Sequence, residues 1–437
     1  VVGTKATILT AEGGITGSGF SSLDAAPISL FIQPNLETTS NEVTISIDRN
    51  GVPFATFAQT ANQTAVANAL DAATSASVLY NIIANYQTGY GLAAAYDSLT
   101  GEIHADLAGT LLDQSMQTEL TLLDRLRQIG VPGARPASVQ PLAYGEEAKT
   151  GTAAFDALQN SGPRYSGWTQ AFGSWLNRDG DGNAASTDSS VGGVLVGADL
   201  ANDNYSFGLA GGYSWGSSDV ANWSASADIQ TGILAAYGGA AFDAVKLRGG
   251  ASMGWSSIDT SRVAMVGSLV ERPQAAYNAT TGNLFGEVAY TAQFGTAMVE
   301  PYVGLGWVSV NADDFSETNA PVTGLSSGGV SYDTGYSTLG ARFSTDVVMN
   351  DTRVTPRAML GWRHAFSDVP PEAAMLFNDA GTGFTVAGTP IAQDSLLVEA
   401  GADVAFSERL SFGVPYNGSF ADGANSNAVK LTGALRF

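Results

Sequence analysis

The chain has 437 residues, no cysteine and a formal net charge of −22. The acidic balance argues against nucleic acid as a partner, because phosphate binding needs clustered lysine and arginine. The absence of cysteine excludes disulfide bonds, thiolate metal sites and cysteine nucleophiles. Charged residues make up only 14% of the chain, against about 25% in ordinary globular domains. This composition suits strands with one apolar face and one face of small polar residues.

Membrane helices and a signal segment are not evident in the sequence. No run of about eighteen apolar residues occurs, and the start has neither a basic region nor an apolar region. If the protein is exported, we expect that its signal has been removed or lies upstream. A closed β-barrel could still cross a bilayer, because its strands need only about 9–11 residues each.

Residues 1–58 and 59–130 differ in character. The first range contains short β segments such as "NEVTISIDRN", bounded by Pro, Asn and Gly. The second range is alanine-rich, with apolar residues at helical spacing, so it predicts a helical region.

A candidate pore helix spans residues 105–129 of this helical region. It carries Leu107, Leu111 and Leu120 along one face and Asp113 and Asp124 on another. From Glu102 to Ile129 a helix would be roughly 40 Å long, at ~1.5 Å per residue. That length exceeds the ~30 Å hydrocarbon layer of a bilayer. A helix packed on a neighbouring element is the alternative interpretation.

Residues 131–164 are rich in Pro, Gly, Ser and Ala and predict a linker, in which residues 152–159 form a rival short helix. From residue 165 to 437 the pattern is that of about twelve strands, two of them predicted at Asn283–Phe294 and Thr338–Val348. The predicted fold class is therefore all-β: an antiparallel transmembrane barrel of about twelve strands, preceded by a helical segment and a short β remnant.

The predicted strands alternate between an apolar face and a face that carries charge. In "VKLRGGASMGW", Val245 and Leu247 oppose Lys246 and Arg248. A charged face cannot form a dry core, so we expect it to line a wet lumen while the apolar face meets lipid. The lumen-lining candidates are Arg248, Glu287, Glu300, Arg342, Arg357, Arg363, Glu399 and Arg436.

Connection lengths support a membrane barrel. Tight turns such as "ANDN" and "MNDT" alternate with long acidic loops, and aromatic residues recur near strand ends. An open strand edge is intolerable in lipid, so we expect the last strand to close on the first. This strand alternates to the final aromatic residue, and its apolar positions form the candidate C-terminal assembly signal: Val429, Leu431, Leu435 and Phe437.

Catalytic and metal-binding motifs are weak. Two G-x-S-x-G matches, around Ser214 and Ser252, lie in β segments rather than in a strand–turn–helix elbow. His104 and His364 have no evident Asp partner, and the calcium-like start at Asp179 lacks the Gly and Glu of a complete loop. We predict no enzymatic activity, no cofactor and no metal site for these residues.

The order of these segments resembles the C-terminal translocator of an autotransporter, a type V secretion protein of Gram-negative bacteria. The resemblance rests on "GWTQAFGSW", "VGGVLVGADL", "FGLAGGYSWG" and "PYVGLGWVSV" for barrel strands, on "LTGEIHADLAGTLLDQSMQTELTLLDRLRQ" for the preceding helix, and on the terminal "AVKLTGALRF". The first sixty residues resemble the end of a β-helical passenger.

The resemblance implies a location in the bacterial outer membrane, with the N-terminal part at the cell surface. It implies export and anchoring of the chain's own passenger, a helix threaded through the lumen, and assembly by periplasmic chaperones and the barrel-assembly machinery, which reads the C-terminal strand. We expect a monomeric barrel in contact with outer-membrane lipid. Some family members cut the passenger between two Asn of the helix, and the absence of such a pair here predicts no cleavage there. A diffusion porin and the anchor of a surface enzyme whose catalytic domain lies outside this chain are the alternatives.

Overall fold

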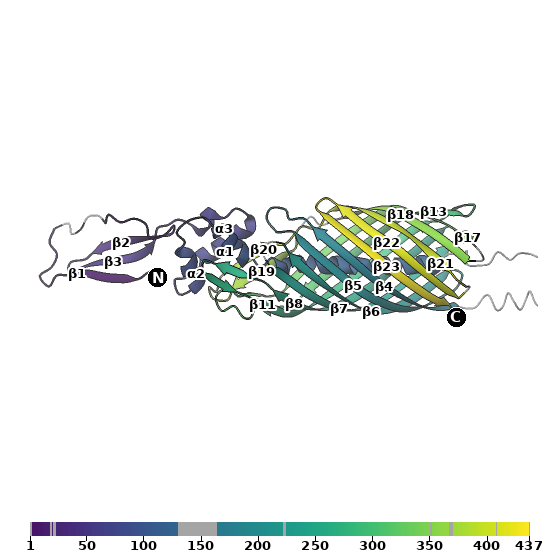
Figure 1. Ribbon diagram of the computed structural model, residues 1–437, viewed down its shortest axis with the longest axis horizontal. Coiled ribbons are helices and arrows are strands. Elements are labelled where there is room, and N and C mark those ends of the chain that lie inside the picture. The colour runs from purple at the N-terminus through teal and green to yellow at the C-terminus, as the bar shows by residue number, and fades with distance from the viewer. Residues whose placement is uncertain are drawn as a thin grey trace, which may run out of the picture.

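The computed structural model describes residues 2–129 and 164–436, apart from residues 18–19, 21–22, 222–223, 350–351, 367–369 and 408. Most of the predicted linker, the rival helix 152–159 and Phe437 therefore lie outside the described residues. The molecule is elongated, with a small N-terminal sheet, a group of helices and a barrel following one another along its long axis (Figure 1).

The N-terminal part is an antiparallel sheet in the order β1-β3-β2, followed by short helices. The strands are β1 (Lys5–Thr10), β2 (Ile32–Thr38) and β3 (Glu42–Arg49), and the helices are η1 (Phe54–Phe57), α1 (Ala61–Asp71), α2 (Val78–Ala84) and α3 (Leu92–Leu99). Thr60 caps α1 by accepting a hydrogen bond from the Gln63 amide, and Ser77 caps α2 in the same way from Tyr80. Each cap satisfies an amide that the first helical turn leaves without an intrahelical partner.

The fourth helix, α4 (Ile103–Ile129), has 27 residues and follows a tight turn at Gly101. Gly101 has a φ of +64°, a conformation that costs glycine least because it has no Cβ. Among the described residues, no helix combines the length and the apolar character needed to cross a membrane.

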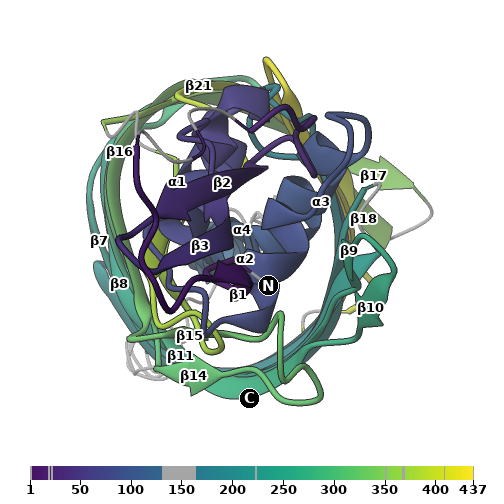
Figure 2. The ribbon, with the colours of Figure 1, turned by 90° about the vertical axis from the view of Figure 1, so that its left-hand side faces the viewer.

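Twelve antiparallel strands form a closed barrel around α4 (Figure 2). Every strand pairs with its sequence neighbours, and the last barrel strand pairs with the first along Ala424–Arg436, which confirms the predicted fold class and its closure. The strands are β4 (Arg164–Arg178), β5 (Thr187–Ala201), β6 (Tyr205–Val220), β7 (Ala225–Phe242), β8 (Val245–Ser261), β11 (Gln274–Tyr290), β13 (Ala297–Ala312), β16 (Val330–Thr345), β18 (Thr352–Ala365), β21 (Asp394–Ala405), β22 (Leu410–Ala421) and β23 (Ala424–Arg436).

The two ends of the barrel differ. At the short-turn end, the barrel strands are joined by brief connections such as residues 202–204 and 243–244. At the long-loop end, loops 179–186, 262–273, 313–329 and 366–393 join them. The remaining strands are extensions near the short-turn end, β12 (Ala292–Phe294) and β17 (Val347–Met349), and loop strands at the long-loop end: β9 (Ala264–Val266), β10 (Leu269–Glu271), β14 (Phe315–Ser316), β15 (Leu325–Ser327), β19 (Glu372–Phe377) and β20 (Gly383–Ala387).

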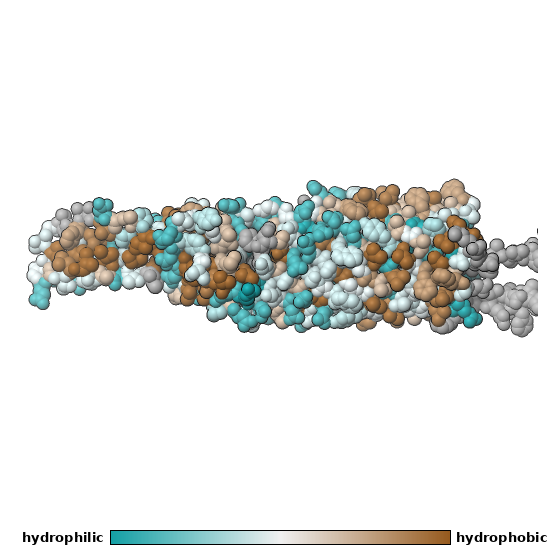
Figure 3. Space-filling model, in the orientation of Figure 1, coloured by the Kyte–Doolittle hydropathy of each residue, from teal (hydrophilic) through white to brown (hydrophobic). Residues whose placement is uncertain are grey.

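The outer surface of the barrel is apolar over its short-turn half, as the alternation predicts. Side chains that point outward from the strands there are large and exposed, among them Leu234 at 59%, Leu305 at 62% and Leu431 at 55%. Figure 3 shows brown patches over this half of the barrel and a more hydrophilic zone toward the helices. An outward apolar band of this kind is what lipid tails require.

The polarity of the wall inverts toward the long-loop end. There the inward side chains are apolar and buried, including Tyr277, Val308 and Val310, whereas Asn278 points outward and is exposed. The predicted strands Asn283–Phe294 and Thr338–Val348 start too late for this reason: β11 begins at Gln274 and β16 at Val330. These strands continue beyond the apolar band, where water surrounds the barrel and the core lies inside it.

Candidate functional site

The candidate site is the lumen of the barrel, which α4 fills over its length (Figures 1 and 2). Twenty-two of the 27 residues of α4 are buried, on all sides of the helix. Many of them are polar, so each must find its hydrogen-bond partners on the barrel wall. The lumen is therefore not the wet channel that the alternation predicted, since its charged side chains are buried against a helix.

At the long-loop end, His104 in the first turn of α4 lies at the centre of a buried polar cluster. Its Nδ1 is 3.0 Å from the Tyr277 hydroxyl and its Nε2 is 3.3 Å from Glu317 Oε1. Arg262 donates two hydrogen bonds to Glu317, at 2.7 and 2.6 Å. These contacts connect α4 to two of the long loops.

The pKa values of two carboxyl groups, Glu317 in this cluster and Glu102 beside it, are shifted in opposite directions. Burial alone would raise the pKa of Glu317, but the charge and hydrogen bonds of Arg262, helped by His104, hold that pKa at about 2. Burial, followed by the nearby charge of Asp106, raises the pKa of Glu102 to about 8. Glu102 lies in the α3–α4 turn and accepts a hydrogen bond from the Ala185 amide at 3.3 Å.

In the middle of the lumen, α4 makes hydrogen bonds to strands on several sides of the barrel. Gln114 donates to Ser214 and accepts from Thr231 at 3.3 Å. Glu119 accepts hydrogen bonds from the Tyr336 hydroxyl and from Asn283 Nδ2. The polar residues of the helix and wall are thus paired with each other across the lumen.

Near the short-turn end, Arg125 of α4 forms a bidentate ion pair with Asp199 of β5. The two nitrogen–oxygen distances are 2.7 and 3.0 Å, and both side chains are almost completely buried. Asp199 also accepts hydrogen bonds from Ser166 and from the Tyr237 hydroxyl, the latter at 3.2 Å. Bidentate guanidinium–carboxylate pairing fixes orientation as well as distance, so this pair sets the rotation of α4 in the barrel.

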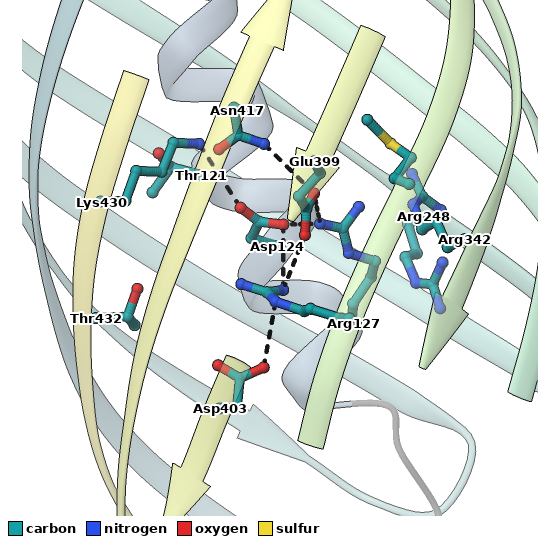
Figure 4. A network of polar contacts seen from close by, with 12 residues as sticks. Thr121, Asp124, Arg127, Arg248, Arg342, Glu399, Asp403, Asn417, Lys430 and Thr432 are labelled. Carbon is teal, nitrogen blue, oxygen red and sulfur yellow. Dashed lines mark hydrogen bonds and ion pairs between the residues drawn. The ribbon is translucent and has the colours of Figure 1, made fainter. Parts of the chain in front are cut away.

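Asp124 and Arg127, which lie on either side of Arg125 along α4, join a second charged cluster (Figure 4). Asp124 pairs with Arg127, with Arg357 at 3.5 Å and with Lys430 at 3.6 Å. Glu399 lies 3.0 Å from Arg127 and 3.4 Å from Arg357. Cations and carboxylates alternate in this cluster, which lowers the cost of burying them.

A third cluster belongs to the wall alone. Arg248 contacts Glu287 and Glu300 at 2.8 Å each, and Arg342 contacts the same two carboxylates at 2.6 and 3.1 Å. Arg342 also lies over the Tyr302 ring, 3.7 Å from its centroid. Four of the lumen-lining candidates are thus brought together by β8, β11, β13 and β16.

The remaining lumen and helix candidates take different positions. Arg363 Nη1 lies 2.9 Å from Met116 Sδ, whereas Arg436 is exposed at the short-turn end of β23. Leu107 and Leu111 are buried in the apolar core at the long-loop end. Asp113 accepts a hydrogen bond from Ser426 at 3.5 Å, and Leu120 is half-buried.

The candidate assembly residues Val429, Leu431 and Leu435 point outward from the closing strand β23. They are 47%, 55% and 42% exposed, respectively. Their neighbours Lys430 and Thr432 point into the lumen and are buried. Phe437 lies outside the described residues.

Sequence reasoning missed several residues of the site, including Asp199, Arg125 and Glu317. Asp199 could have been found, because it lies on the same strand face as Val191 and Leu195, and both of these point inward. His104 was noticed, but its partner Glu317 is more than two hundred positions away in a loop. No spacing rule connects two such residues.

A family model of the autotransporter beta-domain matches residues 167–417, more than half of the chain. Two curated relatives from Serratia marcescens, each named "Extracellular serine protease", are 27% and 26% identical over 480 and 479 aligned positions. Each match covers all of this chain and 43% of the relative. The chain thus spans less than half the length of these relatives.

The fold is similar to that of the translocator domain of the autotransporter NalP from Neisseria meningitidis. The TM-score is 0.52 at 18% sequence identity, and the match covers 65% of this chain and 93% of that domain. The twelve-stranded barrel around α4 agrees with this similarity in fold, and the family match over residues 167–417 shows the family. The chain belongs to the autotransporter family and contains its β-domain, a translocator of the bacterial outer membrane.

Proposed function

We propose that this barrel delivers the polypeptide N-terminal to α4 to the cell surface, and that α4 then remains in the lumen as plug and tether. The observation that carries the proposal is the direction of α4. Its first turn contacts Tyr277 and Glu317 at the long-loop end, and its last turns contact Asp199 and Glu399 at the short-turn end. In outer-membrane barrels the long loops are extracellular, so residues N-terminal to α4 lie outside the cell.

The contents of the lumen favour this function over that of a diffusion porin. The cavity beside the last turn of α4, lined by Arg127, Arg342 and Glu399 among others, has a volume of about 100 Å³. A cavity between Gln114 and Thr231 has a volume of about 20 Å³. The larger space holds about three water molecules at ~30 Å³ each and the smaller at most about one, so neither of these two spaces is wide enough to pass solutes.

The geometry of β23 supports a proposal about the assembly partners. We propose that the barrel-assembly machinery reads its outward row Val429, Leu431 and Leu435 after periplasmic chaperones deliver the chain. These side chains are exposed on a strand that must pair with β4 before the barrel closes. An unclosed edge in lipid leaves backbone groups without partners, so recognition of this strand before closure would protect the open barrel.

The passenger of the whole protein lies N-terminal to the barrel. Because both curated relatives are named extracellular serine proteases, we propose that a serine protease domain precedes this chain in the full protein. The residues in this chain would then have the function of export and anchoring, with catalysis performed upstream.

Cysteine labelling on living cells tests the proposed function, since the chain has no native cysteine. Ser40→Cys lies in the exposed β2–β3 turn, and Asp203→Cys lies in an exposed turn at the short-turn end. A membrane-impermeant maleimide should label the first variant on intact cells and the second only after the outer membrane is broken. Labelling of Asp203→Cys but not Ser40→Cys on intact cells would contradict the proposal.

A further inference from the structure

Three cations of the barrel wall contact α4 at successive heights in the lumen, and we name them the basic ladder: Arg178 of β4, Arg363 of β18 and Lys430 of β23. Arg178 donates to the Gly109 carbonyl at 2.8 Å, Arg363 lies 2.9 Å from Met116 Sδ, and Lys430 lies 3.6 Å from Asp124. The contacted helix positions are about two turns, roughly 11 Å, apart. The ladder thus follows the helix axis through the barrel.

The helix presents an acidic row to this ladder. Asp106, Asp113 and Asp124 are spaced by two and three helical turns, so they lie on one face of α4. Asp113 lies between Gly109 and Met116, the helix positions that Arg178 and Arg363 contact. Lys430 is the ladder member nearest Asp124, as the ion pair between them shows.

The charge of the described wall is complementary to that of the whole helix. Among the buried residues of the described barrel strands, six are cations and four are carboxylates: Arg178, Lys246, Arg248, Arg342, Arg363 and Lys430 against Asp199, Glu287, Glu300 and Glu399. The wall therefore has a surplus of two positive charges. α4 carries four carboxylates and two arginines, which is a surplus of two negative charges.

The segment that precedes α4 is acidic as well. Residues 1–102 contain eight Asp and Glu but only two basic residues, Lys5 and Arg49. Under the proposed function this segment passes through the barrel before α4 occupies it. The chain that travels through the lumen and the helix that stays in it thus have the same sign of charge.

From these observations we propose that the basic ladder makes the lumen selective for anions, and in particular for acidic stretches of the translocating polypeptide. The inference rests on the proposed export function. In a narrow pore with a low-dielectric wall, unpaired charges concentrate ions of opposite sign. Most of the other wall cations already have carboxylate partners on the wall, as Arg248 has Glu287 and Arg357 has Glu399. When α4 is displaced, the ladder loses its contacts and faces the open lumen.

Ion selectivity of the full-length chain gives one test. Arg125→Met removes an α4 contact without changing the wall, so it should increase the frequency of channel openings in planar bilayers. In a potassium chloride gradient, the sign of the reversal potential shows which ion passes more easily. For these openings it should indicate a preference for chloride over potassium. Adding Arg178→Gln, Arg363→Gln and Lys430→Gln should move the reversal potential to zero or to the potassium side. The matched control, Arg248→Gln with Glu300→Gln, keeps the charge surplus and should keep chloride preference. Potassium preference in Arg125→Met itself would overturn the inference.

Surface display in cells gives a second test that does not depend on channel openings. Ser40→Cys labelling is followed over time and normalised to the amount of folded, heat-modifiable barrel. The wall carries either its native ladder or the three Gln substitutions, and the travelling segment carries either its native charges or Glu12→Gln, Glu37→Gln and Glu42→Gln. These three glutamates are exposed in the N-terminal part of the chain, so their substitution should not disturb folding.

The four combinations form a double-mutant cycle. We expect neutralisation of the segment to slow display several-fold through the native wall and to have little effect through the substituted wall. Equal slowing through both walls would overturn the ladder inference while leaving the export function intact. Failure of Ser40→Cys to be labelled in the otherwise unchanged chain would instead contradict the export function itself.

Discussion

The buried pair Arg125–Asp199 should be a principal attachment of α4 to the wall. Arg125→Met leaves Asp199 buried with only its hydrogen bonds from Ser166 and Tyr237. Loss of one partner from a buried ion pair costs about 3–5 kcal/mol. At 1.36 kcal/mol per factor of ten, the population with the end of α4 detached should rise by a factor of roughly 10² to 5 × 10³.

Hydrogen exchange measures that population directly. In detergent or in lipid nanodiscs, the amides of the last two turns of α4 should exchange faster by the same factor, because exchange requires the helix end to open. The matched control is Arg164→Met, which breaks a pair with Asp203 whose members are 57% and 64% exposed and 3.8 Å apart. An exposed pair of this kind contributes at most ~1 kcal/mol, so the control should change exchange less than tenfold.

The double variant Arg125→Met/Asp199→Leu completes the test. Replacing both members of a buried pair with apolar side chains of similar size is often neutral or stabilising, so protection should return most of the way. If Arg125→Met changes exchange no more than Arg164→Met does, or if the double variant is worse than the single one, the pair does not attach the helix.

Three further predictions concern the outer face, the middle of the lumen and the outer cap. Leu431→Arg and Val303→Arg place a charge on outward positions that are 55% and 50% exposed. Each should lower the free energy of unfolding in lipid vesicles by ~2–4 kcal/mol, the cost of an arginine near the bilayer midplane. Unchanged stability would contradict lipid contact at these positions. Gly109→Ala should displace the Arg178 guanidinium, which a Cβ at this position would meet, and so break its 2.8 Å hydrogen bond to the Gly109 carbonyl. The expected loss is about 1.5–3 kcal/mol for a charged hydrogen bond, less ~1 kcal/mol regained from the helix propensity of alanine; Ala108→Gly in the same helix turn is the control for altered helix propensity, and urea unfolding is the measurement. Because the pKa of Glu102 is raised to about 8 from 4.5, its contribution to stability is fully present below pH 4.5 and is lost as the pH rises through 8. Hydrogen-exchange protection of α3 should therefore fall over that range in the native chain and fall less in Glu102→Gln, and equal pH dependence in both would refute the shift.

The lipid-facing part of the fold could be predicted from the sequence, because lipid requires an apolar side chain at every second residue of a strand. Val303, Leu305 and Leu431 are apolar for the same reason in three different strands, so the alternation alone places them outward. The same rule fails at Tyr277 and Val308, which lie inside the barrel beyond the apolar band. The lengths of β11 and β16 were underestimated there, because polarity inverts when the solvent outside changes from lipid to water.

The candidate site could be predicted only in part. The alternation of side chains along each strand placed Arg248, Glu287 and Arg342 on the charged face. It could not show that their charges pair with one another across neighbouring strands. Contacts between α4 and the wall depend on the rotation and height of the helix in the barrel. Neither quantity is encoded in a local pattern, so Arg125–Asp199 and His104–Glu317 emerge only from the three-dimensional structure.

Disulfide trapping tests the central claim, that α4 lies in the lumen with its N-terminus toward the cell surface. Thr110 of α4 and Ser189 of β5 have their hydroxyl oxygens 3.2 Å apart, and the chain has no cysteine to interfere. Side chains this close suit the Cβ separation of about 3.5–4.5 Å that a disulfide needs. Thr110→Cys/Ser189→Cys should therefore cross-link in cell envelopes. The control pair Thr110→Cys/Thr432→Cys should not, because Thr432 is linked through Gln170 to Thr121, about 16 Å further along the helix. Cross-linking of the control pair, with none in the Ser189 pair, would show that α4 does not occupy the lumen in this direction.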